Sequence, residues 1–279
     1  MRLTASVLMG LACLVSASGA PLSSNYVGIN HLMQVSTSGS FAFPNQVNIG
    51  STVTGGGFQA QIGAGNTLTP SMTTTVWCVD SQQSFGNGDT ALANIVKLTS
   101  AGFNPSLTAY GSLTGSGTTK FLNSVGLTTD DALHRFQATA WLVSQYNGFP
   151  SGPLDALPLG GADDLRNDAI QRAIWQITYN NSVAQPWPGL AGGDITSGAP
   201  AAQTWITAAA NFVNNSANAA FFNNWAVVTW GANANGSLVS PGKQTFLVQL
   251  TPEPSFYAVV GLGLAGLWMA KRKKTSPAR

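Results

Sequence analysis

The stretch "TDDALHRFQATAW", Thr129 to Trp141, marks the point at which the chain changes from a strand-like to a helical pattern. Its apolar residues recur at three- and four-residue spacing, as they do on one face of an α-helix. Thr129 or Asp130 can cap the start of this helix, which we expect to end near residues 147–148. Apolar residues repeat with the same period further along the chain and predict helices over residues 164–179 and 201–213.

Both sides of this helical portion read as β-strands. Before it, short runs such as "YVGIN" and "TTVWCVD" are separated by turns rich in Gly, Asn, Ser and Thr, and after it come "WAVVTW" and "QTFLVQL". Because the order is β, then α, then β, we expect the outer portions to share one sheet system. The predicted fold class is α+β, with a single domain over residues 21–250. It comprises a β-barrel or sandwich-like portion (residues 25–80 and 225–250) with an inserted helical portion (residues 129–215).

The first twenty residues have the layout of a secretory signal peptide. Arg2 precedes an apolar run over residues 7–15, and small residues follow as far as Ala20. Cleavage is expected after Ala20 or after Ala17, and either cut removes Cys13 with the apolar run. Lipidation of Cys13 is the alternative, but Gly10 stands where a lipobox carries a leucine-like residue. The chain is therefore predicted to be exported.

A sorting signal is predicted over residues 251–279. The motif Pro252-Glu253-Pro254 precedes a transmembrane helix at residues 256–270 and the basic cluster "KRKK". Fifteen helical residues cover about 22 Å, which is short of the ~30 Å hydrocarbon core of a membrane. The basic cluster would stay on the cytoplasmic side and leave the main domain outside. An uncleaved membrane anchor is the simplest interpretation of this segment taken alone.

The order of these three features also resembles the PEP-CTERM sorting signal of Gram-negative bacteria. That resemblance covers about the last thirty residues. It implies an exosortase-type enzyme as a partner, and a location in the cell envelope, at the cell surface or in the extracellular matrix.

Charge excludes several classes of function. Charged residues make up 8% of the chain, against roughly 25% in ordinary soluble proteins. Between Pro21 and Pro254 six basic residues stand against ten acidic ones, a net charge of minus four. No basic stripe is present for nucleic acid, no cluster has metal-ligand spacing, and no glycine-rich loop fits a phosphate, so we expect no cofactor. Asp163 and Asp164 are interpreted as helix caps.

Cys78 is the one cysteine that the exported chain keeps, and two glutamine motifs follow it. The motifs "FQATAW" and "IQRAIW" place Gln137 and Gln171 four residues before a tryptophan, on the same helix face as that tryptophan. A cysteine thiolate can attack a glutamine carboxamide, expel ammonia and leave a thioester between the two side chains. Such a bond needs protection from water, which Trp77, Trp141 and Trp175 are positioned in sequence to provide.

The segments "WCVD", "FQATAW" and "IQRAIW" together resemble the Cys-Gln thioester domain found at the tips of Gram-positive adhesins. The resemblance spans residues 76–179 and departs from the family pattern at Trp77 and Ile170. It implies a β-barrel-like portion with a helical insertion, a thioester between Cys78 and Gln171, and a supporting role for Gln137. Asp80 is expected to help orient the site, or else to be a polar residue at the end of a strand.

The predicted function is single-turnover covalent capture of an amine or hydroxyl on a surface or matrix molecule, without enzymatic turnover. Three alternatives remain for the thiol: a buried inert cysteine, a disulfide-linked dimer, and a cysteine hydrolase or transglutaminase-like enzyme. The enzyme would need His134, which has Asp130 and Asp131 beside it, or His31. A passive matrix protein that stacks sugar rings on Trp187 and Trp230 is the competing function.

Overall fold

The computed structural model describes residues 20–36, 45–48, 54–80, 86, 88–108, 124–146, 164–178, 199–238 and 244–251. Strands come first, helices follow, and strands return at the end, so the predicted α+β class is confirmed. The strands are β1 (Gly28–Ser36), β2 (Asn45–Asn48), β3 (Thr54–Gly63), β4 (Ser71–Cys78), β5 (Thr90–Lys97), β6 (Trp225–Ala232) and β7 (Thr245–Gln249). The helices are α1 (Ala132–Val143), α2 (Asp164–Thr178) and α4 (Ala199–Asn214), with 3-10 helices η1 (Ser24–Tyr26), η2 (Pro105–Leu107) and η3 (Ser216–Asn224).

The described strands form a closed antiparallel barrel. Their order is β1-β5-β6-β7-β4-β3, and β1 pairs with β3 to complete the ring, while β2 pairs with β3 outside it. Closure leaves no exposed edge in the ring. Neighbouring strands β5 and β6 are joined by the whole helical portion, so the helices are an insertion into a continuous barrel.

Large aromatic side chains from different strands meet inside the barrel. The ring of Phe246 on β7 lies 6.4 Å from that of Phe58 on β3 and 6.2 Å from that of Trp230 on β6. All eight residues of β6 are buried. A barrel of this size is filled by side chains. Its apolar core contributes stability of the kind that disulfides supply in many exported proteins.

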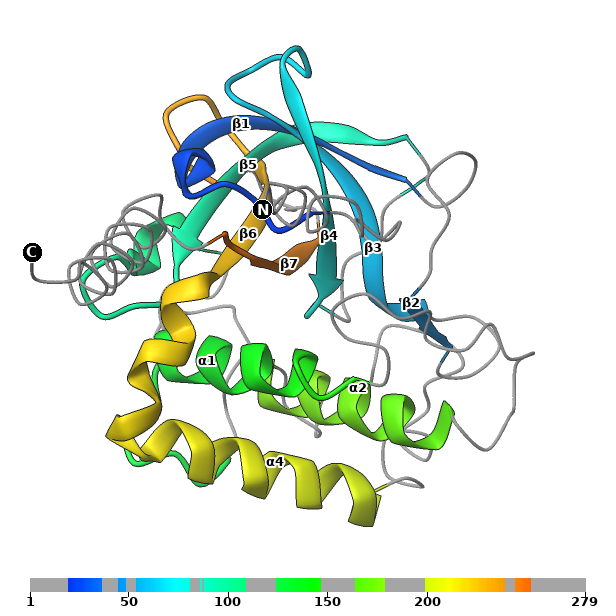
Figure 1. Ribbon diagram of the computed structural model, residues 1–279, viewed down its shortest axis with the longest axis vertical. Helices are drawn as coiled ribbons and strands as arrows, with labels where there is room; N and C mark the ends of the chain where they lie inside the picture. The colour runs from blue at the N-terminus through cyan, green and yellow to red at the C-terminus, as the bar shows by residue number, and fades with distance from the viewer. Residues whose placement is uncertain are drawn as a thin grey trace, which may run out of the picture.

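Helices α1, α2 and α4 lie together on one side of the barrel, below it in the view of Figure 1. Helix α1 packs against α4 through aromatic residues: Trp141 lies 5.5 Å from Phe212 and 6.2 Å from Trp205, measured between ring centroids. Helix α2 contacts α1, α4 and the strands β2 and β3. It is therefore the helix that connects the helical layer to the barrel wall.

The start of α1 differs from the prediction. The residue that caps it is Asp131, whose extended backbone (φ −135°, ψ 176°) lets its carboxylate accept the His134 N–H at 2.9 Å. Asp130, one of the two predicted caps, forms an ion pair with Arg135 instead. The predicted caps were wrong because three polar residues in succession offer the same signal, and only the backbone direction selects among them.

Two elements lie beyond the predicted boundaries. Strand β5 follows residue 80, where the first β portion was expected to end, and it completes the barrel between β1 and β6. Its sequence "TALANIVK" has alanine and asparagine among its first five residues and no aromatic residue, so its strand signal is weak. The 3-10 helix η3 extends the helical portion from residue 215 to residue 224.

Both predicted targeting segments lie outside the described residues. This applies to nearly all of the signal peptide (residues 1–20), to the Pro252-Glu253-Pro254 motif and to the helix at residues 256–270. None of the helices within the described ranges has the length and apolar character needed to span a bilayer.

Candidate functional site

Cys78 is the last residue of β4 and is almost fully enclosed. It pairs in register with Phe246 of β7 and is 2% exposed. Its Sγ accepts a hydrogen bond from Gln244 Nε2 at 2.7 Å and donates one to the backbone oxygen of Asp80 at 3.3 Å. The sulfur is thus held by two polar partners in a buried position. This burial disfavours the disulfide-linked dimer.

The surroundings of the thiol favour its neutral form. Burial, with a smaller contribution from the Asp80 carboxylate, raises the pKa of Cys78 to about 12. Hydrogen bonding from the Asp80 backbone, Trp175 and Gln244 acts in the opposite direction and offsets part of this rise. The thiol is therefore protonated and poorly nucleophilic at neutral pH.

Trp175 lies on α2, one turn after Gln171, and faces the thiol. Its indole Nε1 is buried and meets no acceptor within hydrogen-bond geometry among the described residues. It nevertheless lies close enough to Cys78 to lower the pKa of the thiol. We interpret the indole N–H as a weak donor that points towards the sulfur, with the ring excluding water.

The carboxamide of Gln171 lies beside Cys78, and its hydrogen bonds fix its orientation. Gln171 is fully buried in α2, and its Oε1 accepts hydrogen bonds from the Gly56 N–H at 2.7 Å and the Tyr146 hydroxyl at 2.6 Å. Its Nε2 donates to the backbone oxygen of Cys78 at 3.2 Å. Because oxygen meets two donors and nitrogen meets an acceptor, the amide has one consistent orientation.

Glycines of β3 make room for this carboxamide. A Cβ atom built on Gly55 would lie 2.7 Å from Cδ of Gln171, closer than side chains can approach. Gly56 has φ +87°, a conformation that glycine adopts without strain, and it is the residue that donates to Oε1. The run of three glycines at residues 55–57 is therefore part of the site, and the sequence analysis missed it.

Tyr146 is held in place by Trp77. The two rings stack with centroids 5.5 Å apart and an interplanar angle of 22°, and both residues are buried. Trp77 is on β4 next to Cys78, whereas Tyr146 follows the end of α1. The tryptophan before the cysteine thus orients the tyrosine whose hydroxyl contacts Gln171.

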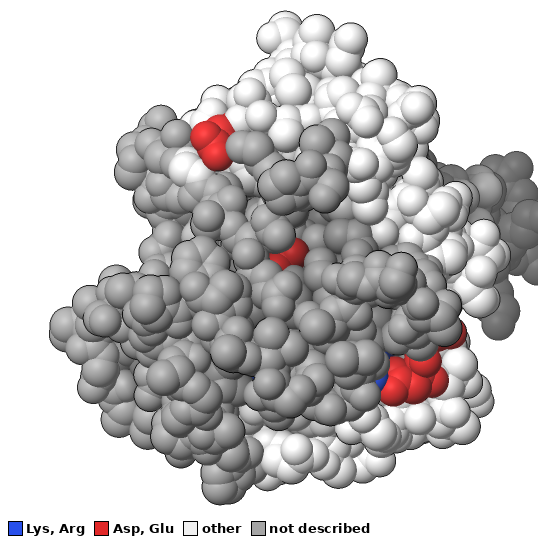
Figure 2. Space-filling model, turned by 180° about the vertical axis from the view of Figure 1, so that it is seen from behind, with Lys and Arg blue, Asp and Glu red and all other residues white. Residues whose placement is uncertain are grey.

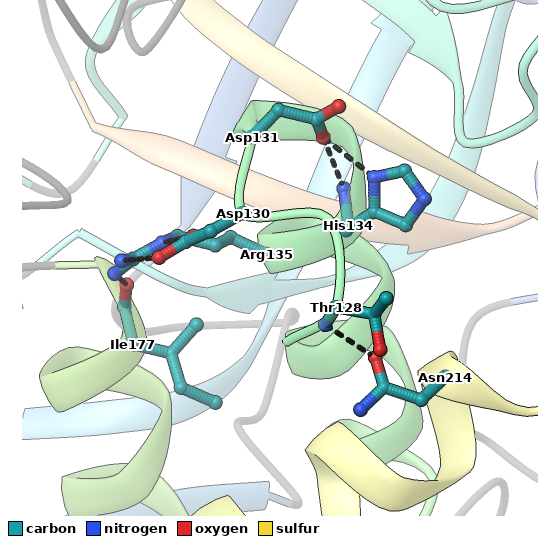
Figure 3. A network of polar contacts seen from close by, with 7 residues as sticks. All are labelled: Thr128, Asp130, Asp131, His134, Arg135, Ile177 and Asn214. Carbon is teal, nitrogen blue, oxygen red and sulfur yellow. Dashed lines mark hydrogen bonds and ion pairs between the residues drawn. The ribbon is translucent and has the colours of Figure 1, made fainter. Parts of the chain in front are cut away.

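The C-terminal end of α2 is fixed to both the barrel and α1. Thr178 Oγ1 donates to the backbone oxygen of Val79 at 2.9 Å, immediately after Cys78. On the other side, buried Arg135 donates to the backbone oxygen of Ile177 at 2.7 Å and pairs with Asp130, as Figure 3 shows. A cation at this position also suits the negative end of the helix dipole. These contacts set how far Gln171 stands from the end of β4.

Gln137 and Trp141 lie elsewhere. Gln137 Nε2 donates to the backbone oxygen of Leu98 at 2.9 Å, and no hydrogen bond connects it with Cys78. Trp141 packs against α4, on Trp205 and Phe212. The structure thus brings Gln171 and Trp175 to Cys78, holds Trp77 against Tyr146 beside Gln171, and places neither Gln137 nor Trp141 there.

Asp80 contacts the site through its backbone. Strand β4 ends at Cys78, and the carbonyl oxygen of Asp80 accepts hydrogen bonds from Cys78 and from Gln244. Asp80 thus lies just beyond the end of the strand, where its peptide carbonyl contacts the thiol and its carboxylate acts on the thiol through its charge.

The two histidines have partners away from the thiol. His134 Nδ1 lies 2.7 Å from Asp131 Oδ1, as Figure 3 shows. With Gln137 and Asn214 it lines a hollow of about 610 Å³ between α1, the end of α4 and η3. His31 Nδ1 is hydrogen-bonded to the backbone oxygen of Gly63 at 3.1 Å. Neither ring forms a hydrogen bond with Cys78 in the part of the chain described.

Trp230 cannot stack on a sugar. It is fully buried inside the barrel, and its Nε1 donates to the backbone oxygen of Ala91 at 3.1 Å. The expectation that it lies at the surface was wrong, because β6 is covered on both faces. Trp187, the other predicted sugar contact, lies outside the described residues.

Charged side chains are sparse on the described surface. On the face in Figure 2 they are few and mainly acidic among the residues described. Groups of three or more His, Cys, Asp or Glu side chains that could hold a metal ion do not occur within the described ranges.

Comparison with known proteins gave no match to a protein-family model, a curated protein or a solved structure.

Proposed function

We propose that this chain is an exported surface protein that captures a partner covalently through a thioester between Cys78 and Gln171. One observation carries the proposal. A fully buried glutamine carboxamide lies beside the only cysteine of the mature chain, with its nitrogen on the cysteine's own carbonyl oxygen and two donors on its oxygen.

Thioester formation needs no reactant besides the two side chains. Sγ of Cys78 adds to Cδ of Gln171, the bond from Cδ to Nε2 breaks, and the nitrogen leaves as ammonia with the thiol proton. A thioester and ammonia replace a thiol and a carboxamide. The burial of both side chains, 2% and 0% exposed, keeps water from the acyl group.

The capture step returns the thiol. An amine or hydroxyl of the partner adds to Cδ of Gln171, the bond from Cδ to Sγ breaks, and the sulfur takes up the proton of the nucleophile. The partner is then joined to Gln171 through an amide or ester. Each molecule reacts once, so the protein acts as a covalent binder rather than as an enzyme.

The intact mass of the purified mature domain tests this proposal. We expect a deficit of one ammonia, which Cys78→Ala and Gln171→Ala each abolish. Gln137→Ala is the matched control and keeps the deficit, since its amide is bonded to Leu98. Methylamine should add to the wild-type domain and to Gln137→Ala, and to neither Cys78→Ala nor Gln171→Ala. A full mass together with a titratable thiol in the wild-type domain would rule the proposal out.

Export and sorting are the second part of the proposal. A signal peptide over residues 1–20 and a PEP-CTERM-type segment over residues 251–279 would deliver the domain to the envelope of a Gram-negative bacterium through an exosortase-type enzyme. Changing Pro252-Glu253-Pro254 to alanines should leave the protein unprocessed in membrane fractions. Unchanged processing and location in that variant would refute this part.

A passive matrix protein with an inert cysteine is the competing function. The observation that favours it is the buried thiol, whose pKa of about 12 makes it unreactive. The mass measurement separates the two functions. The cysteine hydrolase is tested by His134→Ala, which would abolish turnover in an enzyme but leave an ammonia deficit intact.

A further inference from the structure

We propose that Tyr146 and Gln244 stabilise the two charges that develop when the acyl group moves, Tyr146 on the oxygen and Gln244 on the sulfur. This inference rests on the proposed thioester and assigns roles to residues that the sequence motifs do not contain.

The oxygen charge develops on Oε1 of Gln171. When a nucleophile adds to Cδ, the carbonyl oxygen gains negative charge, and it already has the Tyr146 hydroxyl at 2.6 Å and the Gly56 N–H at 2.7 Å. Both donors are fixed before the reaction: Tyr146 by its stack on Trp77, and Gly56 by strand pairing to β2. Donors set in advance in a dry site form an oxyanion hole.

The same donors act on both steps. Cδ and its oxygen remain attached to α2 when ammonia leaves, so the thioester oxygen occupies the place of the amide oxygen. Attack by the cysteine and attack by the partner therefore pass through oxyanions in one position. Loss of the Tyr146 hydroxyl should slow thioester formation and partner capture together.

The sulfur charge develops when the partner displaces Cys78. Burial and the Asp80 carboxylate disfavour a thiolate, whereas the Gln244 amide favours it through a contact of 2.7 Å. Gln244 is 2% exposed, and its nitrogen is also held by the Asp80 carbonyl oxygen. Its N–H groups are thus already positioned to donate hydrogen bonds to the leaving sulfur.

Gln244 is unsuited to be the acyl donor itself. Its nitrogen, rather than its carbonyl carbon, is the atom in contact with Sγ, and the same nitrogen is held by the backbone oxygen of Asp80. A nucleophile has to reach the carbonyl carbon. In Gln171, by contrast, the carbonyl oxygen accepts two hydrogen bonds. The two glutamines beside the cysteine therefore have different roles.

The test uses the mature domain with Tyr146→Phe and Gln244→Met, and with Tyr26→Phe and Gln34→Met as matched controls. Phenylalanine keeps the ring that stacks on Trp77, and methionine keeps the length of Gln244. Tyr26 packs beside His31, and the Gln34 amide bonds to Gly88, so the controls remove the same groups at other places. Concentrated ammonium reverses the bond, and its removal restarts formation, so mass spectrometry follows both formation and methylamine capture.

Tyr146→Phe should slow both steps by about 10²- to 10³-fold. It should also shift the infrared carbonyl band of the thioester to higher frequency, because one hydrogen bond to the oxygen is lost. Gln244→Met should slow capture by about 10- to 100-fold and leave the carbonyl band in place. Both controls should behave as wild type.

The outcomes separate the two proposals. A wild-type domain that never loses ammonia overturns the thioester and this inference with it. A wild-type thioester whose rates and carbonyl band are the same in Tyr146→Phe and Gln244→Met overturns this inference alone. If Gln244→Met does not fold, Gln244→Glu, which keeps the shape and replaces the donor by an acceptor, gives the same comparison.

Discussion

Gly55→Ala provides the sharpest test of the site, because it adds a single methyl group at the contact between barrel and helix. The new Cβ would lie 2.7 Å from Cδ of Gln171 and 2.8 Å from its Cγ and Oε1. Carbon atoms pack comfortably at about 3.5–4.0 Å, so the carboxamide has to retreat by about 1 Å. That movement pulls Oε1 away from Gly56 and Tyr146 and leaves the amide without its fixed position.

The cost follows from the two bonds that are lost. A buried polar group left unsatisfied costs about 1–3 kcal/mol, and glycine-to-alanine exchange returns about 0.4–1 kcal/mol through the unfolded chain. Because two buried donors lose their acceptor, this cost counts twice, and after the glycine contribution is subtracted we expect a loss of roughly 2–4 kcal/mol in the free energy of unfolding. For a domain of this size that lowers the melting temperature by about 5–15 °C.

Calorimetry and intact mass measure the two consequences. Gly65→Ala is the matched control, since a Cβ at that glycine meets nothing within 4 Å and its φ is not positive. We expect Gly65→Ala to melt at the wild-type temperature or up to about 4 °C above it and to show the ammonia deficit, and Gly55→Ala to melt earlier and to lack it. A Gly55→Ala domain with wild-type stability and a complete deficit would refute the placement of Gln171 against β3.

Three further predictions concern the surroundings of the site. Gln137→Ala should keep the thioester and cost about 1 kcal/mol in the free energy of unfolding, the worth of its bond to Leu98, and a lost ammonia deficit would contradict the choice between the glutamines. Asp130→Asn removes the carboxylate that pairs with the buried guanidinium of Arg135 and should cost about 3 kcal/mol, measured by urea unfolding; a cost no larger than that of a surface substitution would show that the pair contributes nothing. In Gln171→Leu, which cannot form the thioester, Cys78 in the folded state has a pKa raised to about 12 from 9.0. The folded state therefore keeps the thiol proton up to a higher pH than the unfolded state does. Stability should then be unaffected by this group below pH 9 and fall between pH 9 and 12 by up to about 1.4 kcal/mol per pH unit, and the fall should vanish in Gln171→Leu combined with Cys78→Ala.

Helical periodicity located the helices well because it is a local property. The observed α2 and α4 begin and end within two residues of the ranges expected from apolar spacing. Strand β5 escaped prediction, because its burial comes from neighbours on either side in the barrel rather than from its own composition. The closure of β1 on β3 is equally non-local and has no signal in either strand.

The candidate site was foreseen only where a motif is contiguous. Cys78 and the two glutamine motifs can be read from the chain, and so can the tryptophan before that cysteine. Gly56 and Tyr146 meet Gln171 across 115 and 25 residues of sequence, and Gln244 meets Cys78 across 166. No local pattern marks a glycine, tyrosine or glutamine for such a contact.

The sequence by itself determined the order of strands and helices and the presence of two helical glutamines, each one turn before a tryptophan. Tertiary structure alone placed the carboxamide of Gln171, and not that of Gln137, against the backbone of Cys78. Both helices carry the same apolar-Gln-Trp spacing, but α1 turns its tryptophan towards α4, whereas α2 rests on the glycines of β3 and presents Gln171 to the end of β4. The physical reason is that the surroundings of a helix side chain depend on what packs against that face of the helix. Closure of the barrel sets those packing contacts.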